Sequence, residues 1–408
     1  MQTNLADFMR GTADGDEADA ILRKCVHCGF CTATCPTYQL LGDELDGPRG
    51  RIYLMKQMFE GAPPTRSTQT HLDRCLTCRN CETTCPSGVQ YGKLVEIGRK
   101  VVEEKVERPL RQRVQRRFLA GFLPNSTLFT PAMKLGQQVR GVLPRKLRAK
   151  IPVPEKPLAP PARKHARKML MLAGCVQPAM MPNVNIATAR VFDALGIEIV
   201  TAPDAGCCGA IRLHLGYNDD ALQDVRNNID AWWPYVENGV EAIVMNASGC
   251  GATVKEYAHL LRNDPMYADK ARRIVELTRD LAEILPMYEE ELVSLARRRG
   301  VHTVAFHPPC TLQHGQQIRG RVEHLLTALG LEVRLPADAH ICCGSAGTYS
   351  VLQPKMAYAL RNQKLDRLEQ TEPQMIVSAN VGCIAHLQSG TSTPVTHWIQ
   401  LLEHLLYG

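Results

Sequence analysis

Aromatic residues are scarce in this chain: Phe, Trp and Tyr together make up 5% of its 408 residues. No run of about 18 apolar residues is present, so no membrane-spanning helix is expected. The N-terminal 20 residues lack a basic stretch followed by an apolar one, so a secretory signal is not expected. These absences favour a reducing cytosol, where dense cysteine is typical of metal binding or redox chemistry and not of structural disulfides.

Enzyme motifs are missing too. No G-x-G-x-x-G fingerprint follows an expected strand, so a nucleotide or a flavin is not expected on this chain. No Ser/His/Asp or H-E-x-x-H arrangement is present either. We therefore assign no catalytic residue.

Positive charge is concentrated in one part of the chain, whose net charge is +7. Between residues 105 and 168 stand 17 lysines and arginines against two acids, Glu107 and Glu155. Such a stretch is typical of a segment that meets an anionic membrane surface or an acidic partner. A solvated, partly helical connector is an equally good interpretation. Nucleic acid is not expected as a partner, because no aromatic interleaving or known binding motif accompanies the charge.

Cysteine is the residue type that stands out, with 16 copies. Two internal repeats account for all of them, eight in each. The first repeat, with an offset of 50 residues, relates LRKCVHCGFCTATCP to LDRCLTCRNCETTCP. The second, with an offset of about 134 residues, relates CCG at 207–209 to CCG at 342–344. Since no cysteine is left over, we expect two separate cysteine systems.

The first system has the spacing C-x2-C-x2-C-x3-C-P, twice. In two-cluster ferredoxins the three closely spaced cysteines bind one [4Fe–4S] cluster and the fourth, before proline, binds the other. One cluster is thus expected on Cys25, Cys28, Cys31 and Cys85. The second is expected on Cys75, Cys78, Cys81 and Cys35.

Zinc is the main alternative for these motifs, but zinc sites usually use two C-x2-C pairs, which would leave the third cysteine of each triplet spare. A disulfide framework is disfavoured by the compartment. Inside the binding loops, His27 and Arg79 are expected to face solvent and not to act as ligands.

The 50-residue separation, with a helix expected at 47–61, favours a helical ferredoxin-type module. Helix is also expected near 96–120, followed by an extended Pro-rich linker at 151–164. Beyond it, strands are expected at 168–175, 197–203 and 302–310, and a strand followed by a loop is expected at 241–250 and at 374–383. Strands that alternate with helices predict α/β halves with mainly parallel sheets, whose strands end near the cysteines.

The expected fold class is therefore an α+β multidomain protein, a helical ferredoxin-type module followed by two duplicated α/β halves. Its expected domains are a helical ferredoxin-like domain at 1–100, a basic connector at 101–165, and two cysteine-rich domains at 166–298 and 299–408.

The second cysteine system has C-x31-CCG and then a lone cysteine in each half. Its members are Cys175, Cys207, Cys208, Cys250, Cys310, Cys342, Cys343 and Cys383. Four thiolates, within one half or across the two, are a candidate set for a further metal or iron–sulfur centre. Thiols used as a redox relay or as structure are the competing interpretation.

This pattern resembles the cysteine-rich CCG domain of heterodisulfide reductase-like proteins. In that family the motif ends in C-x2-C and binds an unusual cluster at a disulfide-reducing site. Here Ala247 and Asn380 stand where the first cysteine of each closing pair would be. One ligand is missing in each half, which counts against disulfide reduction.

The complete layout resembles the family of glycolate oxidase iron–sulfur subunits. The resemblance covers essentially the whole chain and includes CVHCGFCTATCPTYQLLGDELDGPRGRIYL, NNIDAWWP and CCGSAGTY. Subunits of lactate-utilisation and anaerobic glycerol-3-phosphate dehydrogenase complexes share the cysteine layout but less of the sequence in these segments.

The resemblance implies electron transfer from FAD-containing partner subunits that oxidise glycolate to glyoxylate. It also implies a quinone or respiratory-chain acceptor and attachment to the inner face of the cytoplasmic membrane. Clusters pass single electrons and do not accept a hydride, so substrate oxidation belongs on the flavin subunits and not on this chain.

Overall fold

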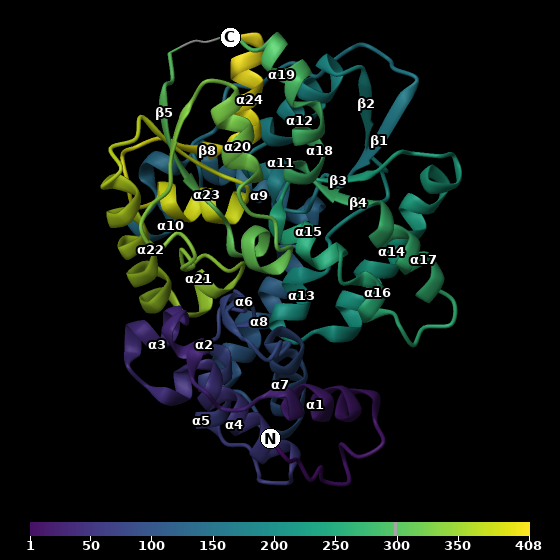
Figure 1. The fold of residues 1–408 in the computed structure, drawn as a ribbon, viewed down its shortest axis with the longest axis vertical. Helices are drawn as coiled ribbons and strands as arrows, with labels where there is room; N and C mark the ends of the chain where they lie inside the picture. Colours follow the sequence, from purple (N-terminus) through teal and green to yellow (C-terminus); the bar gives the residue numbers. More distant parts are fainter. Residues whose placement is uncertain (298–299) are drawn as a thin grey trace. The chain divides into compact units, whose positions relative to one another are not determined.

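The structure is a computed structural model, which describes residues 1–297 and 300–408. The chain divides into two compact units (Figure 1). The first contains Met1–Arg116 and His340–Leu360, and the second contains Arg117–Ala339 and Arg361–Gly408. The domain ranges expected from the repeats are a different partition and stay a prediction.

The first unit is helical. Its elements are α1 (Ala13–Lys24), α2 (Phe30–Ala33), α3 (Pro36–Leu41), η1 (Glu44–Asp46), α4 (Pro48–Phe59), α5 (Arg66–Asp73), α6 (Asn80–Thr84), α7 (Tyr91–Lys105) and α21 (Tyr349–Leu352). Helix α7 packs against α1, α4 and α5. The core between these helices includes Leu22, Met55 and Leu94, all fully buried.

Local sequence explains where these helices begin. Pro36 and Pro48 each occupy the first turn of α3 and α4, where a missing backbone N–H costs nothing. Thr65 and Thr68 form a capping box at the start of α5. The helix expected at 47–61 is α4, so the segment between the two cysteine motifs is helical as the sequence indicates.

The second unit contains two four-stranded parallel sheets, with the orders β2-β1-β3-β4 and β6-β5-β7-β8. The strands of the first sheet are β1 (Arg167–Met171), β2 (Ile197–Val200), β3 (Ile243–Met245) and β4 (Thr278–Asp280). Those of the second are β5 (Thr303–His307), β6 (Glu332–Arg334), β7 (Met375–Ser378) and β8 (Val395–His397). Figure 1 shows the first sheet in blue and teal and the second in green and yellow. The identical strand order matches the internal repeat.

Helices complete the second unit. They are α9 (Ser126–Gln138), η2 (Arg140–Val142), α10 (Arg145–Arg148), α11 (Gln177–Met180), α12 (Asn183–Ala194), α13 (Ala210–Leu215), α14 (Asn218–Glu237), α15 (Ser248–Val254), α16 (Tyr257–Leu260), α17 (Ala268–Leu277), α18 (Leu281–Ile284), η3 (Leu285–Tyr288), α19 (Glu289–Leu295), η4 (Thr311–Gly315), α20 (Arg321–Ala328), α23 (Val381–Gln388) and α24 (Trp398–Tyr407). Two further helices, α8 (Leu110–Phe122) and α22 (Pro354–Glu369), each contribute residues to both units. Within the described ranges, no helix combines the length and apolarity needed to cross a bilayer.

The predicted fold class is confirmed: a helical N-terminal module is followed by two α/β repeats with parallel sheets. The edge strands β4 and β8 do not follow from the sequence pattern. Each has only three residues, too few for a hydrophobic period to be recognised.

Candidate metal centres

The first cavity in the helical module is lined by residues of both cysteine motifs. Cysteines on its wall include Cys25, Cys28, Cys31 and Cys85. Burial raises the pKa of the Cys25 thiol, and the neighbouring Cys85 and Cys28 thiols raise it further. Burial, followed by the Cys25 thiol, raises the pKa of Cys31 to about 11. These four sulfur atoms therefore lie close enough to influence one another electrostatically.

The second cavity is bordered by Cys35, Cys75, Cys78 and Cys81. Burial raises the pKa of the Cys81 thiol well above its usual value, and the thiols of the other three raise it further. Cys81 also borders the first cavity, so the two cavities share this residue. Each cavity gathers the first three cysteines of one motif with the last cysteine of the other. That these thiols ligate clusters stays a prediction.

The loops of the two motifs repeat the same backbone shape. His27 and Thr77 stand at equivalent positions with φ of 56° and 54°, and Gly29 and Arg79 follow with φ of 87° and 58°. Left-handed residues in series turn backbone N–H groups toward a concave side, which suits a group of negative charge. In the second loop the Thr77 N–H lies 3.4 Å from Cys75 Sγ. N–H···S bonds of this kind are common around iron–sulfur clusters.

His27 and Arg79 do not face solvent as expected. Both are only partly exposed, and they border the first and the second cavity respectively. Their left-handed backbone is the reason, because it turns the loop back over the sulfur atoms. His27 Nε2 is buried without a hydrogen-bond partner, and burial, with the Arg49 charge, lowers the pKa of this imidazole.

The donor sets fit iron–sulfur clusters. The first cavity is lined by Cys81 in addition to its own set of four thiols, and the second by four thiols, while a [4Fe–4S] cube takes four cysteine ligands. Thiols raised in pKa give up their protons when a metal binds, so loading of these sites releases protons. Four thiols also suit zinc, and the choice between the two metals depends on the spacing of the motif.

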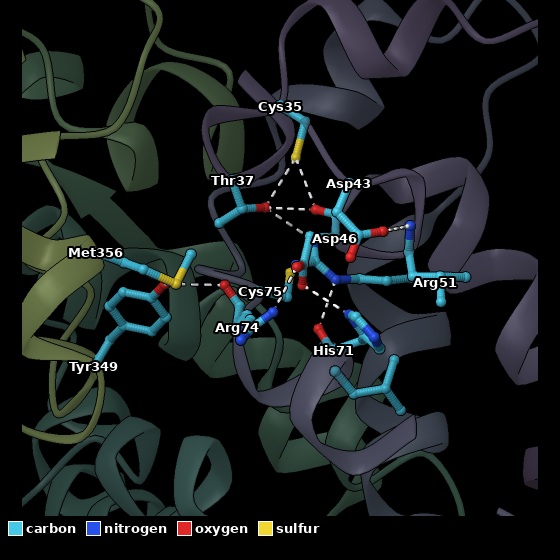
Figure 2. A network of polar contacts seen from close by, with 12 residues as sticks. Cys35, Thr37, Asp43, Asp46, Arg51, His71, Arg74, Cys75, Tyr349 and Met356 are labelled. Atoms are coloured by element: carbon cyan, nitrogen blue, oxygen red, sulfur yellow. Dashed lines mark hydrogen bonds and ion pairs between the residues drawn. The ribbon is translucent and has the colours of Figure 1, made fainter. Parts of the chain in front are cut away.

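A buried polar network adjoins the second cavity (Figure 2). Asp46 is fully buried and accepts from Arg74 at 2.7 Å and from Arg51 at 3.5 Å, and its carboxylate lies 3.0 Å from His71 Nδ1. Its backbone carbonyl accepts from the Thr37 hydroxyl at 2.7 Å. The network thereby joins η1, α3, α4 and α5 behind one set of cysteines.

Apart from the cysteines, the sequence singled out no member of this network, and Arg51 is its most central missed residue. Its guanidinium is 1% exposed and donates to the His71 carbonyl at 2.7 Å and to Thr37 Oγ1 at 3.1 Å. Thr37 Oγ1 lies 3.2 Å from Cys35 Sγ. Burial alone would lower the pKa of Arg51, but Tyr91, Cys75 and Cys35 raise it. The only signal in the sequence is its place in the GPRGR segment between the motifs.

The first α/β half brings its four cysteines together. The thiols influence one another in series, Cys207 acting on the pKa of Cys175, Cys208 on that of Cys207, and Cys250 on that of Cys208. The Cys207 thiol, followed by burial, raises the pKa of Cys175 well above the usual value. The Cys207 thiol lowers the pKa of Cys208, but the Cys250 thiol and burial outweigh it and raise this pKa well above the usual value.

The backbone of this cysteine pair is held by two buried side chains. Asn228 Nδ2 donates to the Cys207 carbonyl at 2.7 Å, and the Tyr257 hydroxyl donates to the Cys208 carbonyl at 3.0 Å. Asn228 belongs to the NNIDAWWP segment of α14, which gives that segment a structural role. That these four thiols bind a metal or a cluster stays a prediction.

The second half divides its cysteines between the units. Cys310 caps η4 and Cys383 lies on α23, both in the second unit. Cys342 and Cys343 belong to the first unit, and both are buried. In that unit, Asn80 Nδ2 donates to the Thr34 and His340 carbonyls at 2.9 and 3.1 Å. The segment that carries the second CCG motif is thereby tied to the loops of the ferredoxin-type module.

The positions of the absent closing cysteines have a structural use. The Asn380 side chain accepts from the Gly382 N–H as the cap of α23, and its Nδ2 donates to Ser248 Oγ at 3.3 Å. The Ser248 N–H donates to the Ala379 carbonyl at 3.0 Å. In the second unit, therefore, Asn380, Ala379 and Ser248, at or beside these positions, hydrogen-bond the two repeats to each other.

Comparisons with known proteins agree with both cysteine systems. A 4Fe-4S dicluster domain model matches residues 21–89, and a cysteine-rich domain model matches residues 169–255 and 304–388. A crystal structure of a hypothetical protein from Helicobacter pylori aligns with a TM-score of 0.58 at 9% identity. It covers 97% of this chain and 73% of that one, and it supports the fold alone.

Two relatives match this chain over most or all of its length. The glycolate oxidase iron-sulfur subunit of Escherichia coli is 56% identical over 100% of this chain and 99% of its own. A probable glycolate oxidase iron-sulfur subunit of Bacillus subtilis is 31% identical over 90% and 89%. Lactate utilization protein A of Geobacillus thermodenitrificans is 27% identical over 58% of this chain and 99% of its own. The chain belongs to the family of glycolate oxidase iron–sulfur subunits.

Proposed function

We propose that this chain is the electron-transfer subunit of a flavin-dependent glycolate dehydrogenase complex. FAD-containing partner subunits oxidise glycolate to glyoxylate, and this chain carries the electrons to a quinone or another respiratory acceptor. The observation that supports the proposal most directly is the arrangement of eight motif cysteines around two adjacent cavities. Membership of the glycolate oxidase family supports the choice of substrate.

In this proposal the two sets of four cysteines hold two [4Fe–4S] clusters, which supply one-electron transfer when bound. The chain's own residues hold and insulate them. Left-handed loops direct N–H groups at the sulfur atoms, and Tyr91, 3% exposed, borders both cavities and helps to exclude water. Pro48 also borders both cavities, so the start of α4 lies between the two sets. This proximity suits electron exchange between them.

Lactate or glycerol-3-phosphate as the substrate of the partner subunits is the weaker alternative. The lactate-utilisation relative matches 58% of this chain at 27% identity, against the full-length match at 56% identity. Disulfide or thiol reduction at the CCG sites is weaker still, because Ala247 and Asn380 replace the closing cysteines.

The four thiols of the first α/β half form a third candidate centre in our proposal. Cys175, Cys207, Cys208 and Cys250 make a continuous series of contacts and are mostly buried, as ligands of a metal or cluster would be. Their mutual contacts give the first half a complete set of four donors despite the absent closing cysteine. The remaining cysteines of the second half stay candidate ligands.

Attachment to an anionic membrane surface is a further part of the proposal. Leu110, Val114 and Phe118 are spaced four residues apart on α8, and each is more than half exposed, at 66%, 59% and 60%. Arg111 and Arg117 lie beside them in the sequence. An apolar stripe with flanking arginines fits the interface of an anionic bilayer. Loss of vesicle flotation on Val114→Glu would support this; unchanged flotation would oppose it.

Iron and acid-labile sulfide analysis of the purified holoprotein, with EPR of the reduced form, tests the central proposal. About eight irons and two interacting S = 1/2 signals are expected from two cubanes. Irons clearly above eight would support the third centre. Zinc without an EPR signal would refute the electron-transfer function. Co-purification with a flavoprotein whose glycolate oxidation reduces the clusters tests the choice of partner and substrate.

The crossed ligand assignment has its own test. Cys85→Ser is expected to perturb the EPR signal of the cluster on Cys25, Cys28 and Cys31, and Cys35→Ser that of the other cluster. The two variants serve as matched controls for each other, because each alters the fourth cysteine of one motif. A Cys85→Ser variant that perturbs only the cluster held by Cys75 would contradict the assignment.

A further inference from the structure

Helix α4 borders the two cysteine sets with different charges. Pro48 lines both cavities, Arg49 lines only the first of them, and Arg51 lines only the second. The Arg49 side chain is 38% exposed and pairs with Glu44 at 2.6 Å. Arg51 is 1% exposed. Two arginines that lie two residues apart on one helix therefore differ in burial, one being partly exposed and the other buried.

A buried guanidinium needs a compensating negative charge, because an unpaired ion in a protein interior is costly. The nearest carboxylate, Asp46, lies 3.5 Å from Arg51 but only 2.7 Å from Arg74. The shorter bonds of Arg51 go to neutral oxygens, the His71 carbonyl and the Thr37 hydroxyl. Taken together, Arg51, Arg74 and Asp46 carry one net positive charge, even with His71 neutral.

The missing negative charge is on the other side of Arg51. Its guanidinium borders the cavity of Cys35, Cys75, Cys78 and Cys81, and Thr37 Oγ1 connects it to Cys35 Sγ over 3.1 and 3.2 Å. A [4Fe–4S] cube on four thiolates carries about two negative charges when oxidised and three when reduced. Arg51 is positioned to balance that charge.

Other cations near this cavity are less effective. Arg79 and Arg99 are both partly exposed, so water screens their charges. Arg51 lies in the interior, where the field of a charge extends with little screening.

We propose that Arg51 is the charge-compensating residue of the cluster on Cys35, Cys75, Cys78 and Cys81, and that it makes this cluster easier to reduce. The inference rests on the proposed function, since it requires a cluster at these thiols. Reduction adds one electron and no proton, and the fixed cation stabilises the added charge. Arg51 is a positioning and charge-setting residue; it is not a ligand.

The test is an EPR-monitored redox titration of the full-length holoprotein. Arg51→Gln is expected to lower the midpoint potential of one cluster. The expected change in the reduced-to-oxidised ratio at fixed ambient potential is about tenfold, or about 59 mV for a one-electron couple. Arg51→Lys keeps the charge and should retain most of the wild-type potential. Arg49→Gln is the matched control on the same helix and should leave this cluster unchanged.

Asp46→Asn distinguishes charge from structure, because it disturbs the same network but removes the opposite charge. It is expected to raise the midpoint potential of the same cluster. The EPR signal that the Cys78→Ser variant perturbs identifies this cluster. Opposite shifts in Arg51→Gln and Asp46→Asn support the inference. Shifts in the same direction, or no shift in Arg51→Gln with full iron content, overturn it. Wild-type protein without iron or sulfide would instead overturn the proposed function.

Discussion

The glycine of the second CCG motif offers a sharp test of why the motif needs glycine. Gly344 has a φ of +86°, in the left-handed region, and a Cβ added there would lie 2.5 Å from the Ala357 carbonyl oxygen. Its counterpart Gly209 has a φ of +90°, but its Cβ would lie 3.1 Å from the Ala221 carbonyl oxygen. Gly239 has a φ of +79° with nothing within 4 Å. The same substitution to alanine at these three sites separates backbone strain from steric overlap.

The expected costs follow from the geometry. Gly239→Ala should cost about 1–2 kcal/mol, the strain of a left-handed residue with a side chain. Gly209→Ala should cost the same strain plus a few tenths, because its neighbour must move only slightly. Gly344→Ala should cost about 2–5 kcal/mol, because overpacking of about 1–3 kcal/mol is added to the strain. The clash is with backbone oxygen, which a side-chain rotation cannot relieve.

Hydrogen–deuterium exchange read by mass spectrometry measures these costs locally, which suits a chain with more than one unit. The segments to compare are 349–360 for Gly344→Ala, 210–225 for Gly209→Ala and 229–240 for Gly239→Ala. The order Gly344 > Gly209 ≥ Gly239 in destabilisation is expected. Equal costs in the three variants would refute the role of the Ala357 carbonyl and leave only backbone strain.

Three further predictions concern stability. Burial lowers the pKa of His397 to about 3, so the free energy of unfolding is unaffected by this group above pH 6.5 and falls as the pH falls from 6.5 toward 3. In urea unfolding, His397→Asn should remove up to about 5 kcal/mol of this acid dependence. Burial raises the pKa of Asp280 to about 6, so the free energy of unfolding falls as the pH rises from 4 through 6. Asp280→Asn should remove this fall and add about 2–3 kcal/mol to the free energy of unfolding at pH 7. An unchanged pH profile would contradict the prediction. Arg108→Ala should cost about 3–5 kcal/mol, because it leaves the buried Asp73 carboxylate without the arginine that donates two hydrogen bonds to it. The exposed control Arg113→Ala should cost under about 0.5 kcal/mol. Similar costs in the two variants would refute the burial argument.

Much of the fold could be predicted from the sequence, because it is encoded in local and repeated signals. The helix between the motifs, the strands before the cysteines and the parallel sheets all follow from periodicity and from the duplication. The family resemblance rests on the cysteine layout together with segments such as NNIDAWWP and CCGSAGTY, and it is confirmed by full-length relatives. Spacing is a strong signal because a cluster dictates the positions of its ligands in three dimensions.

Other features depend on contacts between distant segments, which spacing does not encode. The sequence shows that Ala247 and Asn380 replace cysteines, but not that Asn380 and Ser248 join the two repeats. It shows a second CCG motif, but not that Tyr349 from this segment donates to the Arg74 carbonyl at 3.0 Å, beside Cys75 (Figure 2). Such bonds become visible only when the chain has folded.

Duplication explains why the two cysteine sets look alike, and the single copy of α4 explains why they differ. The loops around Cys28 and Cys78 repeat the same left-handed backbone positions, so the ligand geometry is expected to be equal. Helix α4 lies between the motifs and has no duplicate, so its residues meet the two cavities from different sides. The buried charge of Arg51 therefore borders only one of them. A repeated motif with one asymmetric neighbour is a simple way to give two chemically equal clusters unequal affinities for an electron.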